Sequence, residues 1–194
     1  MRADRAIDVV SIRAVDWLAG DRRHHARERI YDSAAALVET RGFDRLSIDL
    51  IARNVGCSRA TVYRHAGGID AIRDAILIRA TNQVAETVAQ TVKALPAEER
   101  TVGAILVSLK VLRSHPVFAS VGASRETGRL VEQTLIGSPR IPEAAAVIAG
   151  LPGDDKLAAL WMVRVVLGLL YWPVTGIDGA EEAIVRRFVA PWLS

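Results

Sequence analysis

Apolar residues recur along this chain every three or four positions, and polar residues fill most positions between them. That spacing places the apolar side chains on one face of an α-helix, so the sequence predicts amphipathic helices. No segment alternates in the way typical of a β-strand, and we therefore expect an all-α fold. The predicted helices cover residues 22–41, 48–55, 59–65, 69–95, 97–114, 156–172 and 179–191, with a short helical turn at 117–120.

Glycine and proline residues divide this helical pattern into parts. Gly67 and Gly68 separate the third predicted helix from the long fourth one. Several glycines and prolines interrupt residues 123–141, where we predict one or two short helices with mobile joints. The predicted domains are an N-terminal extension at 1–20, a three-helix domain at 21–68, and a helical domain at 69–194 that begins with the long helix. Both a short amphipathic helix and a solvated arm are compatible with the extension.

The segment SIDLIARNVGCSRATVYRH, residues 47–65, reads as two short helices joined by a tight turn. Ser47 and Ser58 are expected N-caps, because a serine hydroxyl can accept a hydrogen bond from a free amide at a helix start. Gly56 supplies the permissive backbone of the turn, and Val62 is expected to face the partner helix. The segment predicts a helix-turn-helix, although an ordinary helical hairpin with a basic surface has the same pattern.

The outward positions of the second helix carry side chains suited to DNA. Arg59 can donate two hydrogen bonds to a guanine, and Thr61 can contact a thymine methyl group or a phosphate. Residues 1–79 hold 14 Arg and 11 acidic residues, whereas residues 80–194 hold 11 basic and 11 acidic residues. The whole excess of +3 therefore lies with the helix-turn-helix, as expected for a domain that binds DNA.

Residues 27–77 resemble the DNA-binding domain of the tetracycline-repressor (TetR) family. An amphipathic first helix is followed by Gly42-Phe43, a serine-led second helix, a glycine turn, a recognition helix that contains Tyr63, and a glycine link into the next helix. The resemblance implies a transcriptional regulator that binds a double-stranded DNA operator. It also implies a homodimeric repressor that leaves the operator when a small-molecule effector binds its C-terminal domain.

The chain departs from the family pattern at two positions. The family usually has an aromatic residue near Ala66 and a phosphate-binding lysine near Ile69. Arg64 and Arg73 are candidates to replace that phosphate contact. The departure leaves open an alternative function, in which the chain is a helical ligand-binding or interaction protein with weakened DNA binding.

The predicted DNA-binding residues are Ser47, Ser58, Arg59, Thr61, Tyr63, Arg64 and His65. We expect Arg59, Thr61 and Tyr63 to contact bases, which would give sequence specificity. Ser47, Arg64 and His65 are expected mainly to contact phosphates, and Ser58 is the N-cap of the second helix. A palindromic operator with half-sites about 34–36 Å apart requires two such surfaces related by a two-fold axis.

The predicted dimer interface lies on the helix at 156–172, together with the last helix. The interface residues recur at three- and four-residue spacing and are Trp161, Val165, Gly168, Leu169 and Trp172. The hydrogen side chain of Gly168 would let two helices approach closely. The same stripe could instead fill the core of a single chain, so both roles are open at this point.

The effector site is predicted among the helices that follow the long helix. Its expected lining residues are Leu106, Leu109, Phe118, Leu130 and Trp161. Such a lining favours an apolar or aromatic molecule, although these residues could equally fill a closed core. Arg125, Arg129 and Arg164 could orient a carboxylate or a hydroxyl, or could be solvated or ion-paired.

No catalytic, phosphate-binding or metal-binding motif stands out, so we expect a protein that is not an enzyme and needs no cofactor. Adjacent histidines at 24 and 25 do not share a helix face and are not expected to bind a metal. The single cysteine, Cys57, excludes an internal disulfide and is interpreted as a small turn residue rather than a redox sensor. Without a long apolar run or a signal-peptide pattern, the expected location is the cytoplasm.

Overall fold

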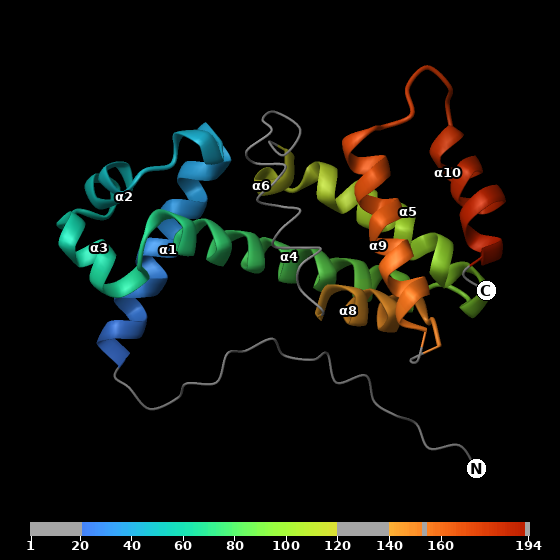
Figure 1. The fold of residues 1–194 in the computed structure, drawn as a ribbon, viewed down its shortest axis with the longest axis horizontal. Coiled ribbons are helices and arrows are strands. Elements are labelled where there is room, and N and C mark those ends of the chain that lie inside the picture. The colour runs from blue at the N-terminus through green and yellow to red at the C-terminus, as the bar shows by residue number, and fades with distance from the viewer. Residues whose placement is uncertain (1–20, 120–139, 153–154, 193–194) are drawn as a thin grey trace, which may run out of the picture.

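The computed structural model describes residues 21–119, 140–152 and 155–192 (Figure 1). Every regular element in these residues is helical, which confirms the predicted all-α fold. The α-helices are α1 (Asp21–Arg41), α2 (Ile48–Val55), α3 (Arg59–Ala66), α4 (Ile69–Lys93), α5 (Arg100–Ser114), α6 (Pro116–Ala119), α8 (Arg140–Ala149), α9 (Lys156–Tyr171) and α10 (Ala180–Ile184). Short 3-10 helices cover Phe43–Arg45, Ala97–Glu99 and Ala190–Trp192, and a π-helical turn covers Val185–Val189.

The helices gather at the two ends of α4. Helices α1, α2 and α3 pack together at one end, and α4 runs from them along the molecule (Figure 1). Helices α5, α8, α9 and α10 surround or follow its other end. One helix therefore belongs to both parts of the protein, as the long apolar stripe in its sequence predicts.

Local signals in the sequence determine the ends of α2 and α3. The hydroxyl of Ser47 accepts a hydrogen bond from the Leu50 N–H at 3.2 Å, and that of Ser58 accepts one from the Thr61 N–H at 3.1 Å. Gly56 ends α2 in the left-handed region, with φ of 76°. Both predicted N-caps and the predicted glycine turn are confirmed, so the turn of the helix-turn-helix is fixed by neighbouring residues.

A continuous apolar core joins the two parts. Ile30 of α1, Ile51 of α2 and Val62 of α3 are almost completely buried, as are Ile72 and Ile76 of α4. Further along α4 the buried stripe continues into contact with the C-terminal helices. The inward orientation expected for Val62 is confirmed.

Helix α8 begins in the last two residues of the stretch 123–141, where short helices are predicted, and continues to Ala149, where no helix is predicted. Its third residue is Pro142, which a helix tolerates in its first turn because the first amides have no intrahelical partner. Gly150 follows the helix with φ of 72°, a left-handed conformation suited to a helix end. Ile141, Ala145 and Ile148 repeat at helical spacing and could have revealed it. The predicted helices at 123–139 and the N-terminal extension lie outside the described residues.

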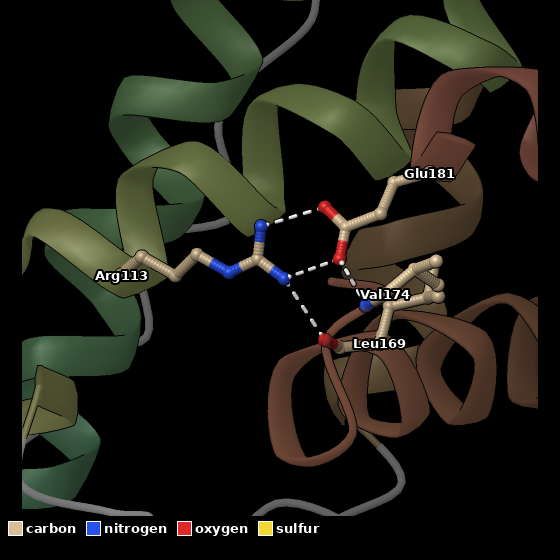
Figure 2. A network of polar contacts seen from close by, with 4 residues as sticks. All are labelled: Arg113, Leu169, Val174 and Glu181. Atoms are coloured by element: carbon tan, nitrogen blue, oxygen red, sulfur yellow. Dashed lines mark hydrogen bonds and ion pairs between the residues drawn. The ribbon is translucent and has the colours of Figure 1, made fainter. Parts of the chain in front are cut away.

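A polar network attaches the C-terminal segment to α5 (Figure 2). The guanidinium of Arg113 donates to both carboxylate oxygens of Glu181 at 2.7 Å and to the Leu169 carbonyl at 2.9 Å. The Val174 N–H donates to the same carboxylate at 3.3 Å. The hydrogen bond from Arg113 lowers the pKa of Glu181, and the carboxylate raises the pKa of Arg113. The network therefore holds the end of α9 and the start of α10 against one side chain of α5.

Candidate DNA-binding surface and ligand cavity

Helix α3 presents one face to solvent and the opposite face to the core. Arg59, Ala60, Tyr63 and Arg64 are exposed and lie at positions that share one side of the helix. Tyr63 is 55% exposed, so its ring is accessible to a binding partner. The exposed face therefore combines a forked cation, a methyl group, an aromatic ring and a second cation. Ala60 was not among the predicted residues, although its methyl group is available to contact a thymine.

Two of the predicted DNA-binding residues are partly covered. Thr61 is half-buried, and its hydroxyl lies 2.9 Å from the Ser58 hydroxyl at the start of α3. His65 is also half-buried, whereas Ser47 and Ser58 are exposed at the starts of α2 and α3. The structure therefore places Thr61 beside the N-cap, and it leaves Arg59, Tyr63 and Arg64 as the most accessible side chains of the set.

An ion pair crosses from α2 to α3 on this surface. The Nε of Arg59 lies 2.8 Å from an Asp49 carboxylate oxygen, and both side chains are more than half exposed. Asp49 was not predicted, because no sequence pattern shows that the first turns of two different helices meet. Its carboxylate orients Arg59 in the free protein, and it would oppose a nearby DNA phosphate by charge repulsion.

The structure accounts for the two departures from the family pattern. Ala66 is buried, and Ile69 packs against the apolar core at the start of α4. Arg73, one of the candidates for a replacement phosphate contact, is turned inward. Its side chain is only 16% exposed, and it donates to the Phe43 carbonyl at 3.4 Å. Of the two candidates, Arg64 is the one that faces solvent.

The C-terminal part holds an apolar cavity of about 420 Å³ between α4, α5, α8 and α9, partly open to solvent. The described residues that line it are Ile78, Thr81, Asn82, Val84, Ala85, Val88, Ala104, Ser108, Leu112, Arg140, Ile141, Ala144, Ala145, Ile148, Met162, Val163, Val166 and Leu167. Alanines from three of the helices contribute to the wall, and their short side chains leave the space unfilled. A cavity of this volume lies within the range of small-molecule sites.

The residues predicted for the effector site lie elsewhere in the structure. Leu106 and Leu109 line a separate depression beside Arg113 and Glu181. Phe118 is buried in α6, and Trp161 is exposed on α9. Leu130 lies outside the described residues. Periodicity identified large apolar residues, whereas the cavity is lined partly by small ones that periodicity cannot distinguish from ordinary core positions.

Helix α9 carries an apolar stripe that other described residues leave largely uncovered. Trp161 is 50% exposed, and Leu157 and Trp172 are each 78% exposed. Gly168 lies between them, and a Cβ placed there would meet nothing within 4 Å. Val165 and Leu169, also predicted for the dimer interface, are half-buried. Contiguous exposed apolar residues of this kind often mark a surface that binds another protein.

Charged and polar side chains tie α1 to α4 near the cavity. Arg79 forms ion pairs with Glu28 and Asp32 of α1, and its guanidinium lies 4.8 Å from the centre of the Tyr31 ring. Its sequence neighbour Ile78 lines the cavity, as does Thr81, which lies two positions further along α4 on the opposite side of the helix from Arg79. The same turns of α4 therefore contact both the DNA-binding part and the cavity.

His115 marks a second junction between the two parts. Its Nε2 lies 3.1 Å from the Gln83 side-chain oxygen, and its Nδ1 accepts a hydrogen bond from the Val117 N–H at 3.3 Å. An accepting Nδ1 requires the neutral ring, with the proton on Nε2. Burial lowers the pKa of His115, partly opposed by the charge of Glu39 in α1.

Neither a metal site nor a membrane-spanning helix is found in the described part of the chain. Among the described residues, no group of three or more His, Cys, Asp or Glu side chains is arranged to hold a metal ion. No helix in the same residues is both long enough and apolar enough to cross a membrane. Cys57 is half-buried in the turn after α2, where its N–H donates to the Ala52 carbonyl at 2.9 Å.

Comparison with protein families identifies the N-terminal part. Residues 30–76 match the model of a family described as bacterial regulatory proteins, tetR family. Over nearly its whole length, the chain is 31% identical to an uncharacterised HTH-type transcriptional regulator of Mycobacterium tuberculosis. That alignment covers 91% of this chain and 89% of the relative.

Solved structures share the whole fold at lower identity. RolR in complex with resorcinol is 17% identical, with a TM-score of 0.64 over 89% of each chain. AlkX of Dietzia sp. strain DQ12-45-1b, a TetR family repressor implicated in biodegradation of n-alkanes, is 18% identical. Its TM-score is 0.61, over 86% of this chain and 94% of that one. At these identities the likeness establishes the fold, including the helical domain that follows α4.

Proposed function

The chain belongs to the TetR family of DNA-binding transcriptional regulators, and from that premise we propose that it is a homodimeric repressor released by an apolar effector. In this proposal two copies bind a palindromic operator through α3. The effector enters the cavity beside α4 and favours a conformation that binds the operator poorly. The observation that carries the proposal is the position of α4, which borders both the DNA-binding part and the cavity.

The proposed reading surface is the exposed face of α3. Arg59 is placed to donate to a guanine, Tyr63 to contact base edges or sugars, and Arg64 to contact a phosphate. Binding to DNA requires Arg59 to exchange the Asp49 carboxylate for a base. Because the ion pair is exposed, breaking it costs little free energy. A base that gives Arg59 no hydrogen-bond acceptor does not compensate even this small cost, so such a sequence is disfavoured.

The proposed dimer interface is the exposed stripe of α9. Two copies would cover Leu157, Trp161 and Trp172, which are exposed in the single chain. Covering apolar surface releases about 25 cal/mol for each Å² removed from water. Gly168 is open to solvent space, so a second helix could approach closely at that position. A two-fold arrangement would also present two α3 helices to one operator.

The proposed switch uses the contacts on opposite sides of α4. A ligand that contacts Ile78 and Thr81 can shift this segment of the helix. Arg79 would transmit the shift, because its ion pairs and its contact with Tyr31 hold α1 to the same turn. A ligand acts only through its different affinities for the two conformations. Differential affinity of about 3 kcal/mol would loosen the operator roughly a hundredfold.

Selection of bound DNA from a random pool, at fixed salt concentration, tests the proposal. We expect enrichment of a palindrome, and we expect the purified protein to bind it as a dimer. If no sequence is enriched and no salt-dependent DNA binding is detected, the result would favour the alternative of a helical ligand-binding protein with weakened DNA binding. A monomer in sedimentation at micromolar concentration would contradict the dimer.

A further inference from the structure

Four of the described residues that line the cavity have polar side chains, and three of the four have no partner within the described part of the chain. Among the described lining residues, Arg140 is the only one that carries a charge. The side chains of Asn82, Ser108 and Arg140 form no hydrogen bond or ion pair within the part of the chain that the structure describes. Thr81, by contrast, donates its hydroxyl proton to the Leu77 carbonyl at 2.7 Å. Three polar groups are therefore available to a bound molecule.

Arg140 lies toward one end of the cavity. The Thr101 hydroxyl donates to the Ala149 carbonyl at 3.3 Å, which places the C-terminal end of α8 beside the start of α5. Arg140 begins α8 and lies about 14 Å from Ala149 along the helix axis, at a rise of 1.5 Å per residue. Helices α8 and α5 pack together and run in opposite directions in Figure 1, so Arg140 lies toward the later turns of α5. The opposite end of the cavity is lined by Val88, Ala104 and Ile148.

The charged end favours an anion. The guanidinium of Arg140 can donate two parallel hydrogen bonds to a carboxylate. Ile141 lines the same cavity from the first turn of α8, and a helix N-terminus adds a partial positive charge there. No acidic residue is among the described lining residues to neutralise this charge. Arg140 is exposed, so the charged head of a ligand would keep contact with water.

We propose that the effector is a monocarboxylate whose carboxylate pairs with Arg140 and whose apolar body extends toward Val88, Ala104 and Ile148. This inference rests on the proposed function, because it names the ligand of the same cavity. A single available cation suits one negative charge, and the apolar wall offers little to solvate a second. A cavity of about 420 Å³ lies in the lower part of the range that holds small organic ligands, which limits the size of the ligand. Straight-chain and aromatic acids share this chemistry.

Calorimetric titration of the full chain at pH 7.4 tests the head group with four probes. Octanoate is compared with 1-octanol, and 2-naphthoate with 2-naphthylmethanol, so that each acid has a neutral partner of similar shape. We expect wild type to bind at least one acid roughly tenfold more tightly than its alcohol, as a charge-assisted hydrogen bond requires. The two acid series decide between a straight-chain and an aromatic body.

Three variants assign the preference to one side chain. Arg140→Gln should bind acid and alcohol alike, with the alcohol affinity unchanged from wild type. Arg140→Lys should keep part of the preference, since it keeps the charge without the fork. Arg41→Gln is the matched control, because Arg41 is exposed at the end of α1 and is not part of the cavity, and it should keep the full preference.

Each outcome separates this inference from the proposed switch. Equal affinity of wild type for acids and alcohols, a preference that persists in Arg140→Gln, or no binding of any probe would overturn the carboxylate assignment. If alcohols bind without preference and release the operator, the switch stands and the head-group assignment fails. If acids bind through Arg140 but operator affinity does not change, the assignment stands and the switch fails.

Discussion

The parts of the molecule at the two ends of α4 differ in how completely they bury their apolar side chains. At the DNA-binding end, Ile30, Ile51 and Val62 fill a closed core, and the exposed face of α3 is mostly polar. At the other end, α9 leaves Trp161 exposed, and an apolar cavity of about 420 Å³ is left between the helices. The comparison shows that the first region is completed by its own side chains. The second region has two apolar surfaces, the cavity wall and the stripe of α9, that the described residues of this chain leave uncovered.

That contrast has an energetic consequence. Unfilled space and exposed apolar side chains both forgo stabilisation that ordinary packing would supply. A ligand that fills the cavity, or a second copy that covers the stripe, can supply this missing stabilisation. The DNA-binding end, whose core is already filled, can then move as a rigid unit when α4 shifts.

We expect the largest effect from substitutions that place a charged side chain in the exposed stripe of α9. Trp161→Glu and Gly168→Arg should each give monomers in sedimentation, because a buried charge and a bulky side chain oppose close helix packing. Operator affinity should fall by roughly a hundredfold or more, since each monomer binds only one half-site. Val147→Glu is the control, because Val147 is 62% exposed on α8 and lies outside the stripe. A dimeric Trp161→Glu protein would place the interface elsewhere.

We expect a smaller effect from substitutions on the exposed face of α3, in the DNA-binding part. Arg59→Ala or Tyr63→Ala should weaken the selected operator by about 1–3 kcal/mol and relax specificity at one base position. Arg64→Ala should instead weaken all DNA sequences alike and lower the salt dependence by about one ion. Gel-shift titrations at several salt concentrations measure both. Wild-type affinity in both Arg59→Ala and Tyr63→Ala would show that α3 does not read the DNA.

A larger side chain in the cavity should give the C-terminal part a filled core like that of the DNA-binding part. Ala145→Leu adds three carbon atoms to the apolar wall and should stabilise the fold by about 1 kcal/mol if they fit. The melting temperature should rise by about 2–4 °C, while ligands no longer stabilise the protein. Thermal denaturation with and without ligand measures both effects. A variant that still responds fully to ligand would locate the binding site outside this cavity.

The smallest effect is expected from the network that holds the C-terminal segment beside the exposed stripe (Figure 2). The pKa of Glu181 is lower in the folded protein than its ordinary value of 4.5. The stabilisation is therefore complete above about pH 4.5 and is lost as the pH falls through the lowered folded pKa. Glu181→Gln should melt below wild type at neutral pH, and the difference should shrink in acid. A difference independent of pH would contradict an ionic role for Glu181.

Sequence reasoning succeeded where the structure depends on near neighbours. Ser47 and Ser58 cap helices through amides three residues away, and Gly56 makes its turn with its own backbone, so the helix-turn-helix could be predicted. The Asp49–Arg59 ion pair could not, because it depends on where two helices meet. The same limit applies to the cavity. Whether Ala145 faces a packed neighbour or unfilled space is decided by the arrangement of four helices rather than by periodicity.

In the proposed switch, occupation of the cavity loosens the operator through α4. The most direct measurement is the operator dissociation constant with and without a saturating ligand whose thermal stabilisation is abolished by Ala145→Leu. We expect the ligand to raise the dissociation constant of wild type roughly tenfold to a hundredfold. We expect a smaller increase in Arg79→Ala, where the link to α1 is lost. A ligand that raises the melting temperature but leaves the operator dissociation constant unchanged would contradict the proposed switch.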